Sequence, residues 1–382
     1  MITTINNKHK ELNFSSGREQ SQACLNSAEH EKNQGRKVLN VPNLRFPEFQ
    51  GEWEEYRIED ITENISSGRC KSHSPNGKYN LYGSTGIIGK TDEACYEGNL
   101  VLVARVGANA GSLQIINEPC GITDNTLIIK SKEVDAQYLY FFLQHFNLNR
   151  LIFGSGQPLI TGGMLKKVKV SLGTVQEQNK LTRLLSFLDE RIATQNKIID
   201  RLQSLIKGIA QKIVHSNKTN VHLSECVECS ASTLQESDVC EHGAYPVYGA
   251  NGIVGYLDNY NTEGEAVYII KDGSGVGTVS YVTGKCSATG TLNTLQAKEG
   301  YSLQYLYYLL NVFNFEPYKT GMAIPHIYFK DYGKAKVFCP SYTEQLQYAR
   351  LLSAIDSELS IEKNFLISLS LQKQYLLRHM FI

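Results

Sequence analysis

The chain has 382 residues with 42% apolar content, enough for two hydrophobic cores, and its Lys+Arg and Asp+Glu counts are equal at 38 each. This neutrality argues against a protein that binds polyanions nonspecifically. It does not exclude a protein that reads DNA through a local basic face. We expect no membrane helix and no signal peptide, because no stretch approaches about eighteen apolar residues. Nine cysteines without an export signal then favour a cytoplasmic protein.

In chain order, the first domain is predicted to follow a polar leader. Residues 1–41 are mostly polar and weakly periodic, so we interpret them as mobile. Residues 42–174 are expected to form a domain of short, irregular strands punctuated by glycines. The strands predicted here are 100–104, 112–116 and 126–129. The tyrosine-rich segment 138–146 is predicted to be a short helix that packs on them.

A long central helix is predicted for residues 175–216, because apolar residues there recur in alternating steps of four and three. The polar Gln195 occupies one place in this heptad seam. The seam consists of Leu181, Leu185, Leu188, Ile192, Gln195, Ile199 and Leu202, and it continues to Ile213. From Leu181 to Ile213 the helix would measure about 50 Å, longer than a compact domain usually needs.

The rest of the chain repeats this plan, with a second domain at 217–340 and a second long helix at 341–382. Tyr82-Gly83-Ser84-Thr85-Gly86-Ile87 returns 166 positions later as Tyr248-Gly249-Ala250-Asn251-Gly252-Ile253. Asn125-Thr126-Leu127 is matched to Asn293-Thr294-Leu295, and Tyr138 to Tyr305. The expected strands are 266–270, 279–282 and 294–296, with a short helix at 305–313.

The second helix carries the same seam as the first. Its members are Leu352, Ile355, Leu359, Glu362, Leu366 and Leu369. Glu362 stands where Gln195 stands, and Lys373 replaces Ile206. Each stripe alone is compatible with a helix that packs on its own domain, but two matched stripes favour a helix pair. The predicted fold is α+β: two tandem domains separated by two long helices in an antiparallel coiled coil, with Gln195 and Glu362 fixing the register.

The sequence lacks the common catalytic motifs. Val267–Ile270 followed by Gly273-Ser274-Gly275-Val276-Gly277 imitates a dinucleotide-binding turn, but the next residues have a strand pattern where a helix is required. The chain has no Walker-type lysine loop, nucleophile elbow or zinc-protease histidine pair. We therefore predict that the isolated chain is not an enzyme.

One cysteine cluster is a metal candidate. Cys226 and Cys229 form a C-x-x-C pair, and Cys240 and His242 follow, so four ligands for tetrahedral zinc are available in principle. The matching part of the first repeat, around Ile61, has no cysteine. Buried free thiols are the favoured interpretation, and no metal is predicted.

Several segments together resemble the specificity subunit of type I restriction-modification systems. They are Pro42–Phe49 with Gly51-Glu52-Trp53, the twin Tyr-Gly-x-x-Gly-Ile-x-Gly blocks, Gly154–Pro158 before Lys166–Val170, and the Glu177-Gln178 and Glu344-Gln345 pairs that begin the long helices. The resemblance covers residues 42–382. Its specificity lies in the duplicated order of the segments, since no single one is decisive.

The resemblance implies two target recognition domains, each reading one half of a split, asymmetric sequence in double-stranded DNA. The paired helices would set the gap between the halves and dock two methyltransferase subunits. Two restriction subunits would complete the enzyme. S-adenosylmethionine, ATP and Mg are expected on these partners, with no cofactor in this chain. The alternatives are a coiled-coil adaptor that does not bind DNA, and an enzyme whose site forms between the repeats.

Candidate DNA contacts follow from comparing the repeats, because side chains that differ on equal scaffolds would read different half-sites. They are Ser84, Thr85, Lys90, Arg105, Asn109 and Gln157 in the first domain, and Asn251, Lys271, Asp272, Ser274 and His326 in the second. As alternatives, Ser84, Thr85 and Asn251 would satisfy turn backbone, and Arg105 would form an internal ion pair. The shared glycines with Ile87 and Ile253 are predicted to be framework, and Tyr82 and Tyr248 to be core aromatics.

Overall fold

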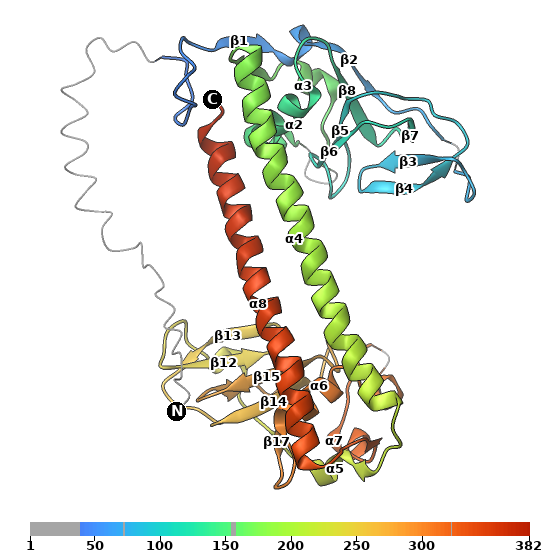
Figure 1. Ribbon diagram of the computed structural model, residues 1–382, viewed down its shortest axis with the longest axis vertical. Coiled ribbons are helices and arrows are strands. Elements are labelled where there is room, and N and C mark those ends of the chain that lie inside the picture. Colours follow the sequence, from blue (N-terminus) through green and yellow to red (C-terminus); the bar gives the residue numbers. More distant parts are fainter. Residues whose placement is uncertain (1–38, 72, 154–157, 322) are drawn as a thin grey trace, which may run out of the picture. The chain divides into compact units, whose positions relative to one another are not determined.

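The computed structural model describes residues 39–71, 73–153, 158–321 and 323–382 (Figure 1). The predicted leader at 1–41 therefore lies almost entirely outside the described residues. The chain forms two compact units, of which the first combines the residues up to Leu185 with Gln374–Ile382 and the second is Ser186–Lys373. Each unit holds one α+β domain and parts of both long helices, whereas the sequence boundaries gave each long helix a segment of its own.

The first domain contains three small sheets. The four-stranded sheet has the order β2-β8-β5-β6, the three-stranded sheet has the order β4-β3-β7, and β1 pairs with β9. The strands are β1 (Glu54–Arg57), β2 (Thr62–Ser67), β3 (Tyr79–Gly83), β4 (Gly86–Thr91), β5 (Leu100–Ala104), β6 (Leu113–Ile116), β7 (Cys120–Ile122), β8 (Thr126–Ser131) and β9 (Lys169–Leu172). The helices are η1 (Ile58–Asp60), α2 (Ala136–Phe146), η2 (Leu148–Leu151) and α3 (Gly162–Lys166).

The second domain repeats this topology. Its sheets have the orders β11-β17-β14-β15 and β13-β12-β16, and β10 pairs with β18. The strands are β10 (Val221–His222), β11 (Val227–Ala231), β12 (Tyr245–Gly249), β13 (Gly252–Leu257), β14 (Glu265–Ile270), β15 (Val279–Thr283), β16 (Ser287–Ala288), β17 (Leu292–Ala297) and β18 (Lys336–Val337). The helices are α5 (Leu223–Cys226), η3 (Glu236–Asp238), α6 (Leu303–Leu310), η4 (Glu316–Tyr318) and α7 (Phe329–Tyr332). The predicted duplication is confirmed.

Strand pairing corrects one of the sequence matches. Ala104 of β5 is opposite Thr126 of β8, and in the second domain Ile270 is opposite Leu292. Thr126 therefore corresponds to Leu292, and the match of Asn125-Thr126-Leu127 to Asn293-Thr294-Leu295 is wrong by two residues. A shift of two keeps every side chain on the same face of the sheet, so the apolar pattern alone could not expose the error.

The central strands are buried on both faces, which explains their unbroken apolar runs. On one face of β14, Val267 and Ile269 join a core with residues of α6 and with Leu352 of the second long helix. On the other face Tyr268 packs in a core to which Tyr248 of the three-stranded sheet contributes. Tyr82 packs on the matching core of the first domain, so both tyrosines are core aromatics, as predicted.

The short helices begin at side-chain caps. The Asp135 carboxylate accepts a hydrogen bond from Gln137 N at 2.8 Å at the start of α2, and Ser302 Oγ accepts one from Tyr305 N at 3.3 Å at the start of α6. Tyr138 and Tyr305 then donate from their hydroxyls to backbone oxygens near the end of each domain, at 3.0 and 2.8 Å. These matched bonds support the correspondence of α2 with α6, although α6 ends at Leu310, before the predicted limit.

The two long helices are α4 (Val175–His215) and α8 (Tyr342–His379). Within the second unit they run antiparallel, because Gln195 Nε2 bonds to the carbonyl and carboxylate of Glu362 while Asp189 pairs with Lys373 at 2.5 Å. The predicted polar pair is thus formed. Of the predicted seam residues in this unit, Leu188, Ile199, Leu352, Leu359 and Leu369 are buried and Ile192, Leu202, Ile355 and Leu366 are half-buried. Leu181 and Leu185 are buried in the first unit.

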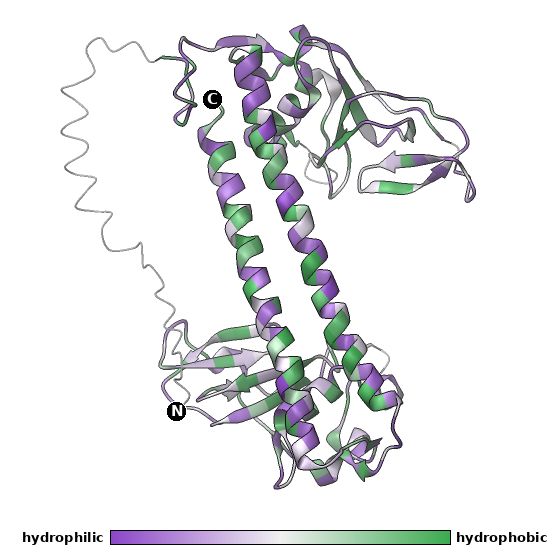
Figure 2. Ribbon diagram, viewed as in Figure 1, coloured by the Kyte–Doolittle hydropathy of each residue, from purple (hydrophilic) through white to green (hydrophobic). Residues whose placement is uncertain are grey.

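Apolar residues recur along both helices (Figure 2). In the described residues no helix combines the length and the apolar character that crossing a membrane requires.

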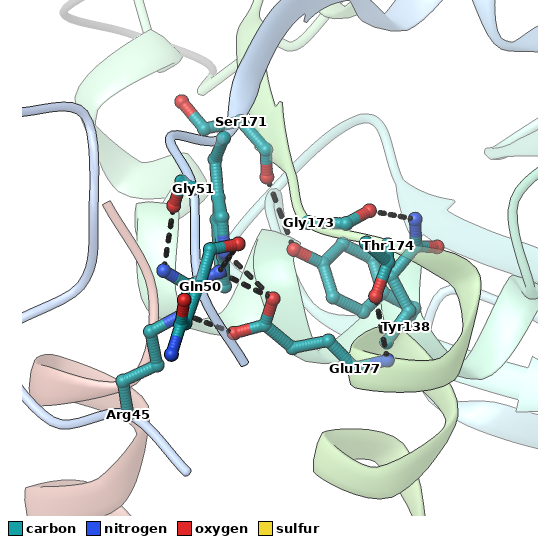
Figure 3. Close-up of polar contacts among 10 residues, drawn as sticks. Arg45, Gln50, Gly51, Tyr138, Ser171, Gly173, Thr174 and Glu177 are labelled. Carbon is teal, nitrogen blue, oxygen red and sulfur yellow. Dashed lines mark hydrogen bonds and ion pairs between the residues drawn. The ribbon is translucent and has the colours of Figure 1, made fainter. Parts of the chain in front are cut away.

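The segment that leads into β1 is attached to the start of α4 (Figure 3). Arg45 Nε and Nη2 donate to the two carboxylate oxygens of Glu177 at 2.7 and 2.8 Å, and the indole N–H of Trp53 donates to Glu177 Oε2 at 3.1 Å. Glu177 is only 2% exposed. In the same unit Leu44 N donates to His379 O at 2.8 Å, so this segment also holds the end of α8.

Candidate nucleic-acid interface

A glycine loop follows the central strand of each domain. In the first domain the loop runs from Arg105 through Gly107 to Gly111, and in the second from Lys271 through Gly273 to Gly277. All four glycines have positive φ, between 77° and 95°, where a side chain would be strained. The second loop leads into β15, a strand, so it does not form the helix N-terminus that a dinucleotide site requires.

A second segment crosses each glycine loop with identical backbone hydrogen bonds. Gly107 N donates to Pro158 O at 3.1 Å and Ile160 N to Arg105 O at 2.8 Å. The second domain forms the equivalent bonds, from Gly273 N to Pro325 O at 3.0 Å and from Ile327 N to Lys271 O at 2.9 Å. Both domains therefore present two crossed loops with one backbone and different side chains.

In the second domain these loops bring predicted contact residues together. Asp272 Oδ1 lies 2.7 Å from His326 Nδ1, and the side chains are 37% and 36% exposed. Tyr328 lies next to them with its ring at 26° to the imidazole, and the Lys330 ammonium lies 5.2 Å from the centre of that ring. Lys271 is half-buried and Ser274 is exposed. Tyr328 and Lys330 were missed from the sequence, because only the crossing of the loops places them here.

In the first domain the loop residues have other neighbours. Arg105 Nη1 donates to Ser67 Oγ at 3.0 Å, so this bond takes the place of the internal ion pair considered above. Its Nε is buried and has no partner among the described residues. Val106 and Leu159 are half-buried, and Asn109 is exposed. Gln157 lies outside the described residues. Arg105 is thus anchored at one end of its guanidinium.

The hairpin tips form a separate candidate surface. Ser84 and Thr85 make the turn between β3 and β4, and Asn251 lies at the matching turn in the second domain. Thr85 and Asn251 are exposed, whereas Lys90 is held by a 2.8 Å bond to Asn80. The structure places these residues on strands other than those that carry the crossed loops.

The isoleucines of these hairpins are exposed, so their prediction as framework is wrong. Ile87 is 57% and Ile253 is 53% exposed. An isoleucine that follows a turn glycine reads as a core residue in sequence, but in both repeats the hairpin directs it outward. The recurrence of an exposed apolar residue in both domains is a feature that the sequence already contained.

The four cysteine and histidine metal candidates do not converge. Cys226 Sγ lies 3.7 Å from Cys339 Sγ in the core, while Cys240 forms a backbone bridge with Tyr256. Burial raises the pKa of the Cys229 thiol to about 11. Among the described residues no group of three or more His, Cys, Asp or Glu side chains is arranged to hold a metal ion.

Acidic residues outnumber basic ones in the second domain. Its residues from Val221 to Cys339 include seven Lys and twelve Asp or Glu. Three of the glutamates, Glu228, Glu263 and Glu265, line one groove of about 650 Å³. That groove would repel a phosphate backbone, so the crossed loops with Lys271 and Lys330 are the better candidate for DNA.

Comparison with known proteins gives a consistent result. The model of the type I restriction modification DNA specificity domain matches twice, at residues 50–204 and 216–370. A putative type I specificity subunit of Mycoplasma genitalium is 25% identical over 342 residues, which cover 81% of this chain and 88% of that protein. The EcoprrI specificity subunit of Escherichia coli is 27% identical over 175 residues, covering 46% of this chain and 39% of that protein.

The fold agrees with a solved structure. The crystal structure of the type I restriction-modification S subunit from M. genitalium has a TM-score of 0.67 at 19% identity, covering 90% of this chain and 99% of that one. The two domain matches together span well over half of the sequence and coincide with the two structural repeats. The chain therefore belongs to the type I restriction modification DNA specificity family, as a specificity subunit with two recognition repeats.

Proposed function

We propose that each repeat reads one half of a bipartite, asymmetric DNA sequence, and that the paired helices set the gap between the halves. The observation that carries this proposal is the pair of crossed loops, which share their backbone hydrogen bonds but differ in side chains. Equal scaffolds with unequal side chains suit the recognition of two different half-sites in the same way.

We further propose that two methyltransferase subunits dock on the helices and that two restriction subunits complete the complex. The long helix α8 supports a docking role, because Ile361, Ile367 and Leu371 are 60%, 57% and 60% exposed in the second unit. Apolar side chains that stay exposed along a helix are typical of an interaction surface. S-adenosylmethionine, ATP and Mg would be bound by these partners, and the complex would act on DNA in the cytoplasm.

The proposal is tested by mapping adenine methylation in DNA from cells that express this chain with its cognate methyltransferase subunit. Cells with the methyltransferase subunit alone are the control. We expect methylation at one split, asymmetric motif with a fixed gap, present only with the chain. A complex that forms and binds S-adenosylmethionine but adds no motif would contradict the proposal and favour the adaptor.

The gap is tested by lengthening both helices. Seven residues inserted after Gln195 and seven before Glu362 keep the heptad phase and the Gln195–Glu362 pair, and add about 10 Å, or about three base pairs. We expect both half-sites to stay the same while the gap grows. An unchanged gap would show that the helices do not measure it.

Docking is tested separately with I367S/L371S. We expect weaker association with the methyltransferase subunit in a pull-down or titration, because two exposed apolar contacts are removed. The control is D200N/S204T, which alters the corresponding exposed positions of α4 and keeps them polar. Equal association of both variants would exclude this part of α8 from the interface.

A further inference from the structure

One pair of positions in the crossed loops differs in chemical kind between the repeats. Val106 and Leu159 form an antiparallel bridge in the first domain, and Asp272 and His326 form the same bridge in the second. The flanking backbone hydrogen bonds described above are matched as well. An apolar pair in one domain therefore stands where an acid and an imidazole stand in the other.

The Asp272–His326 pair is not required to hold the loops together. The first domain forms the same crossing with Val106 and Leu159, where no side-chain ion pair is available. A side-chain contact that water still reaches on both partners also contributes little to stability. A purely structural role thus leaves the choice of Asp and His unexplained.

The pair is both oriented and accessible. The 2.7 Å contact fixes the imidazole relative to the carboxylate, and Tyr328 lies nearly parallel to the ring. About one third of each side chain remains exposed, so a ligand can reach both. Lys271 precedes Asp272 in the loop, and the Lys330 ammonium lies over Tyr328, so the crossed loops carry two positive charges in addition to the carboxylate. These lysines would offset its repulsion of a phosphate backbone.

We propose that Asp272 and His326 determine the specificity of the second domain at one base pair, by accepting a hydrogen bond from the exocyclic amino group of cytosine. The inference rests on the proposed function. Val106 and Leu159 are the corresponding pair in the first domain, where they would contact a thymine methyl group. The two half-sites would then differ at matched positions because these two pairs differ.

The chemistry follows from the hydrogen bond between the two side chains. The carboxylate can only accept, so an imidazole in its neutral form carries its proton on Nδ1, which leaves Nε2 as an acceptor. Acceptors of this kind suit the N4 amino group of cytosine, which keeps one N–H free in the major groove, whereas adenine would place its N7 acceptor against them. They oppose the acceptors O6 and N7 of guanine. Valine and leucine offer neither donor nor acceptor but fit the thymine methyl.

The test exchanges the pairs between repeats. D272V/H326L gives the second domain the side chains of the first, and V106D/L159H does the reverse. Methylation maps are recorded for both variants with the cognate methyltransferase subunit. For D272V/H326L we expect the first half-site and the gap to be unchanged, and preference at one base pair of the second half-site to fall roughly tenfold to hundredfold. V106D/L159H is expected to alter only the first half-site.

Controls separate specificity from folding. E263Q breaks the exposed Lys285–Glu263 ion pair in the same domain, at the end of β14 opposite to the glycine loop, and is expected to leave the motif unchanged. D272N keeps size and polarity but introduces a donor, and H326Q replaces the oriented imidazole with a flexible amide that can turn its donor toward the base, so each is expected to shift the preference at the same base pair. These single variants decide the question if D272V/H326L fails to fold, as judged by its thermal unfolding.

The outcomes distinguish this inference from the function on which it rests. If the wild-type chain adds no bipartite motif, the proposed function fails. If the wild type adds a motif and the folded D272V/H326L, D272N and H326Q variants methylate it with unchanged preference at every base pair, the pair only shapes the loop and this inference alone is overturned. A shift confined to one base pair of the second half-site supports it.

Discussion

The two long helices begin with the same Glu-Gln pair, and the glutamines bond alike whereas the glutamates do not. Gln178 and Gln345 each donate to a backbone oxygen five residues earlier, at 2.9 Å in both repeats. Glu177 is buried against Arg45 and Trp53. Glu344 is exposed and only caps its own helix, accepting from Ser341.

The difference arises from how each domain is connected. In the second repeat the chain passes directly from the end of α4 into β10, and Ile213 of α4 packs in the domain core. In the first repeat the matching place is taken by the end of α8, where Phe381 packs on Tyr138, and by the separate segment that carries Arg45. Side-chain contacts thus attach the helix end to the domain in the first repeat, whereas a continuous backbone does so in the second.

The largest expected effect comes from breaking the ion pair between Arg45 and the buried Glu177. E177Q leaves the Arg45 guanidinium without its carboxylate in a position that is 16% exposed, so we expect the free energy of unfolding of the first unit to fall by about 3 kcal/mol. Denaturant unfolding monitored by the fluorescence of Trp53, the single tryptophan, measures it. E344Q is the matched control, with an expected loss of about 1 kcal/mol or less. Equal losses would refute the contrast between the two glutamates.

The second prediction concerns the polar pair that occupies matched seam positions. Q195L alone leaves Glu362 facing an apolar side chain, and we expect a loss of about 2 kcal/mol. Q195L/E362L removes both polar groups and is expected to be at least as stable as the wild type, because the seam becomes continuous. Urea unfolding of both single variants and the double variant gives the coupling energy. Additive losses would mean that the two side chains do not interact.

The third prediction uses His145, whose counterpart in the second repeat is Val312. His145 Nδ1 donates to Leu377 O at 2.7 Å, and burial lowers the pKa of its imidazole. Because the folded pKa lies below the ordinary value of about 6.5, the unfolded state takes up the proton first. The contribution of neutral His145 to the free energy of unfolding is therefore fully present above about pH 6.5, and it is lost as the pH falls below that value. H145N keeps a donor without titrating, so its unfolding midpoint should change less between pH 7 and pH 5. An equal pH dependence of the unfolding midpoint in H145N and the wild type would contradict this role of His145.

The sequence predicted what depends on local pattern. The buried run Leu100–Ala104 was placed correctly because its apolar residues and flanking glycines are adjacent in the chain. Gln195 and Glu362 were paired correctly because two long stripes, interrupted at one place, admit a single antiparallel alignment. Because the chain is duplicated, each element could be predicted from two copies, which compensated for the weak sequence signal of the short strands.

Contacts between distant segments could not be predicted in this way. Arg45 reaches Glu177 across 132 positions, and Asp272 reaches His326 across 54, and neither distance has a periodic signal. The same holds for the contact between the buried Cys226 and Cys339 thiols, because the sequence grouped Cys226 only with its neighbours Cys229, Cys240 and His242. For the candidate site, the sequence indicated residues on both crossing segments, while their pairing required the fold.

The smallest expected effect lies at Lys373, which stands where the first stripe has Ile206. Lys373 is 16% exposed and pairs with Asp189, which is 33% exposed, so the pair is only partly screened by water. K373I exchanges this ion pair for apolar burial in the seam, and we expect a loss of no more than about 1 kcal/mol. In the mirror variant I206K the new ammonium faces Asp356, which lines the same pocket as Ile206. The loss of apolar burial at position 206 is offset by a new ion pair with Asp356, so we expect almost no net change in the free energy of unfolding. Urea unfolding of the two variants measures both, and a loss above about 2 kcal/mol in K373I would mean that the Lys373–Asp189 pair, like the Arg45–Glu177 ion pair, is required to hold its repeat together.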